Sequence, residues 1–129
     1  MIEAALVTLL EAAAPLQALV GARIYNTQAP DDEAQAHLVF AAVSGQHING
    51  INANTGWRRG RYQLTAWASS PTASRAIRAA AQAALDRYKG TVAGTVIDDI
   101  TFADGPSGYD GLLDSYYRIT DALIDYQET

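Results

Sequence analysis

Apolar residues along the chain change their spacing at the short segment Ser69-Ser70-Pro71. Before it, residues 61–68 alternate between apolar and polar, which is typical of a half-buried strand. After it, apolar residues of 71–89 recur every three or four positions, which predicts an amphipathic helix. Ser69 or Ser70 can cap this helix, Pro71 suits its first turn, and Gly90 can end it. The pattern therefore predicts a strand that runs directly into a helix.

The start of the chain has the same helical spacing. Four apolar residues recur at that spacing and predict a first helix of about three turns: Ile2, Leu6, Leu9 and Ala13. Pro15 interrupts this pattern, and a second short turn over Leu16 to Val20 ends at Gly21. An extended segment follows at residues 23–25.

Further strands are predicted before and after the strand–helix segment 61–89. His37 to Ser44 is a buried strand and Trp57 to Ala68 is its partner, with a long loop from Gly45 to Gly56 between them. Two later strands are expected, at Val92–Phe102 with a bulge near Asp98-Asp99 and at Tyr116–Gln127, separated by a turn-rich loop at 104–114. The loop at 45–56 is too long for a tight hairpin.

The predicted order of elements is α-β-β-α-β-β. Paired strands with intervening helices favour an α+β fold, with an antiparallel sheet of about four strands and two main helices packed on one face. The 129 residues are expected to form one domain, 1–129, which buries about two-thirds of the surface of its unfolded chain. The other face of the sheet would carry Arg59, Arg61, Gln63, Thr65 and Trp67.

Composition narrows the possible functions. The chain is 49% apolar and 18% charged, which is a globular balance, and its net charge of −5 argues against a broad nucleic-acid-binding face. It has no cysteine, so a disulfide scaffold, an iron–sulfur cluster and thiolate zinc are excluded. No apolar run approaches the roughly 20 residues of a membrane span. The start of the chain has no basic segment followed by an apolar core, so we do not expect a signal peptide. We expect the chain to fold in the cytoplasm.

No motif of known catalytic chemistry is found. Nucleophile elbows, phosphate loops and dinucleotide fingerprints are absent. His37 and His47 are ten residues apart, and nothing in that spacing requires a shared metal. The neighbouring carboxylates Asp31-Asp32 and Asp98-Asp99 are not held across a cleft, as general acid–base catalysis requires. We therefore expect no enzyme, no metal and no cofactor, although a small hydrolase using His47 stays a minor alternative.

Two groups of residues are candidates for contacts with other proteins. Three arginines lie among aromatic residues, an arrangement that can bind single-stranded nucleic acid, but pairing with acidic residues of a neighbouring subunit fits the negative chain better. The candidate subunit or partner interface is Arg58, Arg59, Arg61, Trp67, Arg75 and Arg78. The candidate partner-contact loop is His47, Ile48, Asn49, Asn52 and Asn54.

The order of short motifs resembles one known family over nearly the whole chain. The opening IEAALVTLLEAAAPLQALVGARIY is followed by Ala29-Pro30, a Leu38-Val39-Phe40 strand that ends at Ser44-Gly45, and an arginine-started strand that ends at Trp67-Ala68. An alanine-rich helix closing on Gly90 and a final strand with Tyr117-Arg118 complete the series. This series resembles the tail-completion, or tail-terminator, proteins of long-tailed bacteriophages and gene transfer agents. The Asn-rich loop HINGINANTG is longer than that resemblance leads us to expect.

The resemblance implies a structural virion protein of the tail or neck. Such proteins form rings, commonly hexamers, on the head-proximal end of the tail tube, where they stop tube polymerisation and join the tail to the head–tail connector. The implied partners are further copies of the chain, the tube protein and the connector protein. DNA would pass through the ring without sequence-specific binding, and no membrane is involved. The alternative is a small α+β module that binds a ligand or peptide without catalysis.

Overall fold

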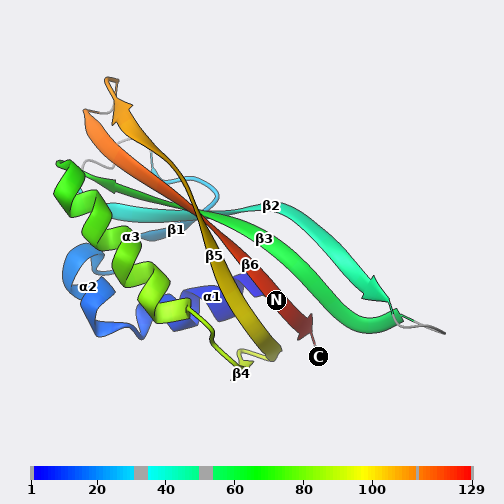
Figure 1. Ribbon diagram of the computed structural model, residues 1–129. Helices are drawn as coiled ribbons and strands as arrows, with labels where there is room; N and C mark the ends of the chain where they lie inside the picture. Colours follow the sequence, from blue (N-terminus) through cyan, green and yellow to red (C-terminus); the bar gives the residue numbers. More distant parts are fainter. Residues whose placement is uncertain (1, 31–34, 50–53, 113, 129) are drawn as a thin grey trace.

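A computed structural model of the chain describes residues 2–30, 35–49, 54–112 and 114–128, with the backbone alone at 44–49, 54–56 and 128. Within these residues, three helices lie against one face of a strongly curved six-stranded sheet (Figure 1). Two hairpins of the sheet extend beyond the helices, in opposite directions (Figure 1). The fold therefore has a packed body and two projecting ends.

The first two helices form where the apolar spacing predicts them. Helix α1 spans Ile2–Glu11 and buries Ile2, Leu6 and Leu10, which are spaced one helical turn apart. Helix α2 spans Ala14–Val20, carries Pro15 in its first turn and ends at Gly21, whose φ of 57° lies in the left-handed region. The break at Pro15 and the stop at Gly21 are both confirmed.

Helix α3, Pro71–Leu85, starts as predicted and ends earlier. The Ser70 Oγ accepts a hydrogen bond from the Ala73 backbone N–H at 3.1 Å, which confirms the N-cap. The predicted end at Gly90 is wrong: Arg87 adopts a φ of 57°, and its N–H donates to the Ile100 carbonyl at 2.8 Å. This bond to a distant strand turns the chain away from the helix, and Gly90 instead begins a new strand.

The sheet differs from the predicted one in size and direction. Its strands are β1 Ile24–Asn26, β2 His37–Asn49, β3 Asn54–Ala68, β4 Gly90–Val92, β5 Thr95–Asp110 and β6 Ser115–Glu128. They lie in the order β1-β2-β3-β6-β5-β4, with β1 parallel to β2 and all other pairs antiparallel. The prediction of a four-stranded antiparallel sheet with two helices in the order α-β-β-α-β-β is therefore wrong. Strands of three residues, such as β1 and β4, are too short to show an alternating pattern.

Both predicted long loops are largely strand. Residues 45–49 continue β2 and residues 54–56 begin β3, with Asn49 opposite Asn54, so these parts of the expected 45–56 loop are strand. Residues 50–53 lie outside the described residues. The expected loop at 104–114 is strand as far as Asp110, with an irregularity between Asp104 and Ser107. The bulge expected near Asp98-Asp99 is confirmed by a register shift between Ile97 and Asp99.

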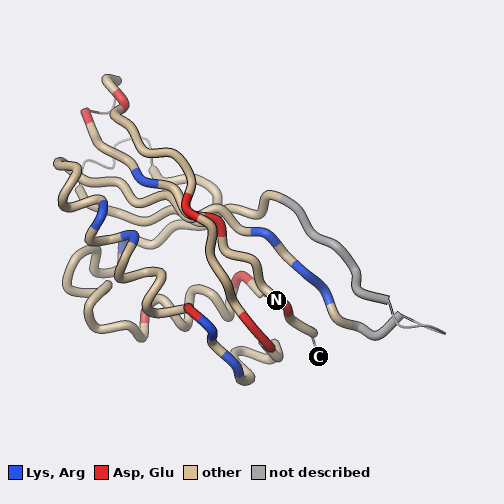
Figure 2. Tube along the Cα trace, in the orientation of Figure 1, with Lys and Arg blue, Asp and Glu red and all other residues tan. Residues whose placement is uncertain are grey.

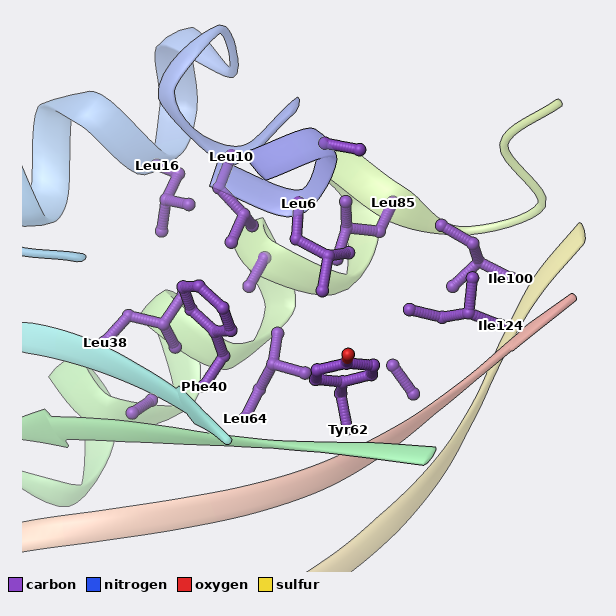
Figure 3. Packing of buried hydrophobic residues seen from close by; sticks show 14 of the residues in the cluster. Leu6, Leu10, Leu16, Leu38, Phe40, Tyr62, Leu64, Leu85, Ile100 and Ile124 are labelled. Atoms are coloured by element: carbon purple, nitrogen blue, oxygen red, sulfur yellow. The ribbon is translucent and has the colours of Figure 1, made fainter. Parts of the chain in front are cut away.

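The core fills the space between the helices and one sheet face. In Figure 3, Leu6, Leu10 and Leu16 point from the helices toward Phe40 and Leu64 on the sheet. All five are essentially inaccessible to solvent. On β3 the buried apolar residues are every second position, as predicted: Tyr62, Leu64, Ala66 and Ala68. None of the three described helices covers the opposite sheet face, which we call the open face.

Candidate functional site

The sheet face opposite the helices carries two cross-strand ion pairs. Arg59 Nε donates to Asp125 Oδ1 at 2.7 Å, and Arg61 Nε donates to Asp121 Oδ2 at 3.1 Å. The two arginines are two residues apart on β3, so their side chains leave the same face and meet carboxylates of β6. The hydrogen bond and charge of Asp125 raise the pKa of Arg59. The acidic partners of these arginines therefore include residues of the same chain.

An aromatic row crosses the same face at its other end. The ring of His37 stacks on Trp67 with centroids 6.1 Å apart, and Tyr25 and Tyr117 contact the two ends of this pair at 5.8 and 5.2 Å. His37 begins β2, as predicted, and is 6% exposed. Its Nδ1 lies 2.7 Å from the Gln35 carbonyl oxygen. The row ties β1, β2, β3 and β6 together and leaves Trp67 half-buried on the open face.

The remaining predicted interface residues lie elsewhere. Arg75 and Arg78 are on α3, in the helix layer on the other side of the sheet. Arg75 is exposed, and Arg78 pairs with Asp104 at 3.7 Å. Arg58 is exposed on β3 near the outer part of the β2–β3 hairpin. The structure therefore brings Arg59, Arg61 and Trp67 onto one surface and places the α3 arginines on a second one.

The predicted partner-contact residues belong to the β2–β3 hairpin. His47, Ile48 and Asn49 lie in β2, and Asn54 lies in β3. Asn52 lies outside the described residues. We call residues 44–49 and 54–56 the β2–β3 arm. Figure 1 shows that this arm leaves the body of the protein on the side of the C-terminus.

A second projecting element was missed by the sequence analysis. The β5–β6 hairpin ends in a turn that carries Tyr109, Asp110, Leu112 and Asp114, which we call the β5–β6 tip. The Tyr109 hydroxyl donates to Asp114 Oδ1, and this bond raises the Tyr109 pKa above its ordinary value. The Leu112 N–H donates to Asp110 Oδ1 at 2.9 Å. In the sequence, two leucines stand between Asp110 and Asp114, and apolar residues in a polar turn can indicate a contact surface. The many turn residues of 104–114 led instead to the prediction of a loop.

The surface of the described residues has several depressions. One of about 370 Å³ lies on the open face beside His37 and Trp67, and one of about 250 Å³ lies between the start of α3 and the β5–β6 hairpin, beside Arg118. Among the residues that the structure describes, no three His, Asp or Glu side chains are grouped so that they could hold a metal ion.

The helices of the described residues are short. No single one of them is long and apolar enough to cross a membrane. Helices α1 and α2 meet the length and composition only when taken together, and they are bent by 86°.

The fold and its surfaces define a β-rich domain whose distinctive features are two unlike faces and two projecting hairpins. The family model described as "Tail completion protein gp17" matches residues 4–120. The chain therefore belongs to the tail completion protein gp17 family, and its role is that of a structural protein of a phage-type tail. The family resemblance found in the sequence is confirmed.

A solved structure has a similar fold. It is a chain of the "Virion of native gene transfer agent (GTA) particle", with a TM-score of 0.71 and 18% sequence identity. The alignment covers 98% of this chain and 93% of that one. The shared fold therefore extends over nearly the whole chain. A search among curated proteins found no match.

Proposed function

We propose that the chain caps the head-proximal end of a tail tube as a ring, ends tube polymerisation and joins the tail to the head connector. Membership of the tail-completion family supports a position at the end of a tail. The single observation that carries the joining role is the presence of unlike hairpins at opposite ends of one sheet. A protein that links two different structures needs two different binding ends.

The topology explains why these ends are opposite. The start of β3, next to the β2–β3 arm, pairs with the end of β6, so that Trp57 lies opposite Gln127. The end of β3 pairs with the start of β6, where Ala68 lies opposite Tyr116 near the β5–β6 tip. The central antiparallel pair thus separates the two hairpin ends by its full length. We assign one end to the tube protein and the other to the connector protein.

A ring also requires each subunit to present two different surfaces to its neighbours. A closed ring is built from heterologous contacts, in which one surface of a subunit meets a different surface of the next. The open sheet face with Arg59, Arg61 and Trp67 and the helix layer with Arg75 and Arg78 are two such surfaces. Both keep their predicted role as subunit contacts in this proposal. A hexamer is the expected ring, through which DNA passes without sequence-specific binding.

The test combines the mass of the assembly with the length of the tube. In native mass spectrometry the chain, alone or with the tube protein of its own particle, should form a ring. Tubes polymerised in its presence should stop at shorter lengths in electron micrographs. If no ring forms in either condition and tube lengths stay unchanged, the proposal is wrong.

A variant pair tests the open face as a subunit contact. We expect Arg59→Ala with Arg61→Ala to reduce the ring fraction at least about tenfold. Arginines in the centre of an interface contribute more to the free energy of binding than charged residues outside it do. The matched control is Arg87→Ala with Lys89→Ala, which removes two ion pairs with Asp99 and Asp98 near the β4 edge. Equal ring fractions in both double variants would remove the open face from the interface.

A further inference from the structure

Leu112 is the most exposed large apolar side chain in the part of the chain that the structure describes. Its relative exposure is 98%, and the next most exposed residue of this kind is Tyr109 at 51%. Tyr109 lies on the same hairpin end. A fully exposed leucine beside a half-exposed tyrosine gives the β5–β6 tip an apolar contact surface that the packing of the domain does not use.

Hydrogen bonds and a ring contact hold the backbone on both sides of Leu112. The Asp110 carboxylate accepts the Leu112 N–H at 2.9 Å, and Asp114 accepts the Tyr109 hydroxyl across the turn. The Tyr109 ring packs on Tyr116 with centroids 4.9 Å apart. A turn whose backbone is already fixed loses less conformational freedom on binding, so it is suited to present an anchor residue.

The charges around the leucine indicate what kind of surface it meets. Asp110 and Asp114 flank it, and Figure 2 shows acidic positions at the end of this hairpin. The complementary surface is an apolar pocket bordered by lysine or arginine side chains. Another copy of the chain is less suited to supply it, because the chain has 14 acidic and 9 basic residues and so carries a net charge of −5.

We propose that the β5–β6 tip docks Leu112 into an apolar pocket, bordered by cationic side chains, on a different virion protein. This inference rests on the proposed joining function and identifies one of its two binding ends. Leu112 and Tyr109 provide the apolar contact, and Asp110 and Asp114 both shape the turn and complement the charge of the pocket.

Site-specific cross-linking tests the identity of the partner. Because the chain has no cysteine, Leu112→Cys places a single thiol at the tip, which can be labelled with a benzophenone maleimide before assembly into particles. Irradiation should link position 112 to a different virion protein. The control is Ala18→Cys, on the exposed side of α2, which should not give the same product. A product with a second copy of the chain, or no product specific to position 112, would overturn the proposal.

A pair of leucine truncations tests the contribution of the anchor. Leu112→Ala should weaken binding of the full chain to the purified connector or tube protein of its particle at least about tenfold. Leu19→Ala removes the same atoms from a leucine that is 38% exposed on α2, and should change that affinity less than about twofold. Equal effects of the two variants on both proteins would contradict the proposal.

Ring mass separates this inference from the proposed function. Leu112→Ala should leave the ring mass and the melting temperature of the chain unchanged, because the side chain has no packing contact to lose. If the unaltered chain forms no ring in either condition and tube lengths stay unchanged, the proposed function fails, whereas the cross-link at position 112 still reports whether the tip meets another protein.

Discussion

Asp114 combines an unusual backbone conformation with a specific side-chain contact. Its φ of 50° lies in the left-handed region, which Asp and Asn tolerate better than most residues do. From this position its carboxylate accepts the hydroxyl of Tyr109. The hydrogen bond exists only while Tyr109 is protonated, so it is the main reason that the Tyr109 pKa is raised above 10.0. Smaller contributions to the raised Tyr109 pKa come from desolvation and then from the negative charges of neighbouring groups, among them Asp114 and Asp110.

Asp114→Asn should lower the pKa of Tyr109 toward 10.0, because it removes the negative acceptor and keeps a residue that accepts a positive φ. The raised folded-state pKa means that this contact stabilises the protein below the ordinary tyrosine pKa and is lost as the pH rises through the folded value. Carbon-13 NMR of the tyrosine ζ carbons against pH measures the shift. Asp110→Asn is the control and should have a smaller effect. A Tyr109 pKa that does not change in Asp114→Asn would contradict this account.

At the scale of elements, local chemistry was sufficient where an element is determined by its own residues. The cap at Ser70, the break at Pro15 and the stop at Gly21 depend on backbone groups within a few positions, so the sequence predicts them correctly. The end of α3 depends on a hydrogen bond from Arg87 to Ile100, thirteen residues later. No local pattern contains that bond, and Gly90 was therefore assigned the wrong role.

Strand pairing explains the other errors. The segment from Asp104 to Asp110 is rich in turn residues, yet it pairs with β6 because Ser107, Gly108 and Tyr109 lie opposite Arg118, Tyr117 and Tyr116. The irregularity after Asp104 absorbs Gly105 and Pro106, so the sheet can continue beyond them. Asparagine and glycine in 45–56 likewise indicated a loop. Pairing with a neighbouring strand of the folded sheet outweighs these local preferences for turns.

The candidate contact surfaces were predictable only in part. Alternation along β3 correctly separates Arg59, Arg61 and Trp67 from the buried positions. It does not reveal that Asp125 and Asp121 face the arginines, because that depends on the register between β3 and β6. The β5–β6 tip was not identified because its residues were assigned to a loop without a fixed shape.

Helix α3 provides a direct test of local stabilisation. Ser70→Ala should lower the free energy of unfolding by about 1 kcal/mol, because the Ala73 N–H loses its acceptor. Ser69→Ala is a matched control on an exposed neighbouring serine and should change stability by less than about 0.5 kcal/mol. Urea unfolding monitored by circular dichroism measures both. Equal losses would show that the cap bond does not stabilise the helix.

At the scale of the whole molecule, the β2–β3 arm projects from the body of the protein. Figure 1 shows that this hairpin extends beyond the three helices that cover the sheet. The helices pack on the inner parts of the sheet, where Leu38, Phe40 and Leu64 are buried. This arrangement allows binding and folding to be tested independently.

Replacing residues 47–58 with Asn-Gly joins Gln46 to Arg59, which are already opposite each other, through a two-residue hairpin turn. We expect this variant to unfold cooperatively, with a melting temperature lowered by only a few degrees, while its capacity to end tube growth is lost. Differential scanning calorimetry and tube-length measurement give the two results. Retained tube termination would exclude the arm from that role, and loss of cooperative unfolding would show that the arm belongs to the core.

The position of β6 has a consequence for synthesis. It is the last strand along the chain and yet lies in the middle of the sheet, between β3 and β5, and its residue Asp121 meets Arg61 from sixty positions earlier. A nascent chain therefore cannot join the two halves of its sheet until this strand has left the ribosome. A prematurely terminated chain would lack both the strand and the carboxylates that face the arginines of β3. The sheet and its ion-paired face are therefore complete only in chains that have been translated through β6.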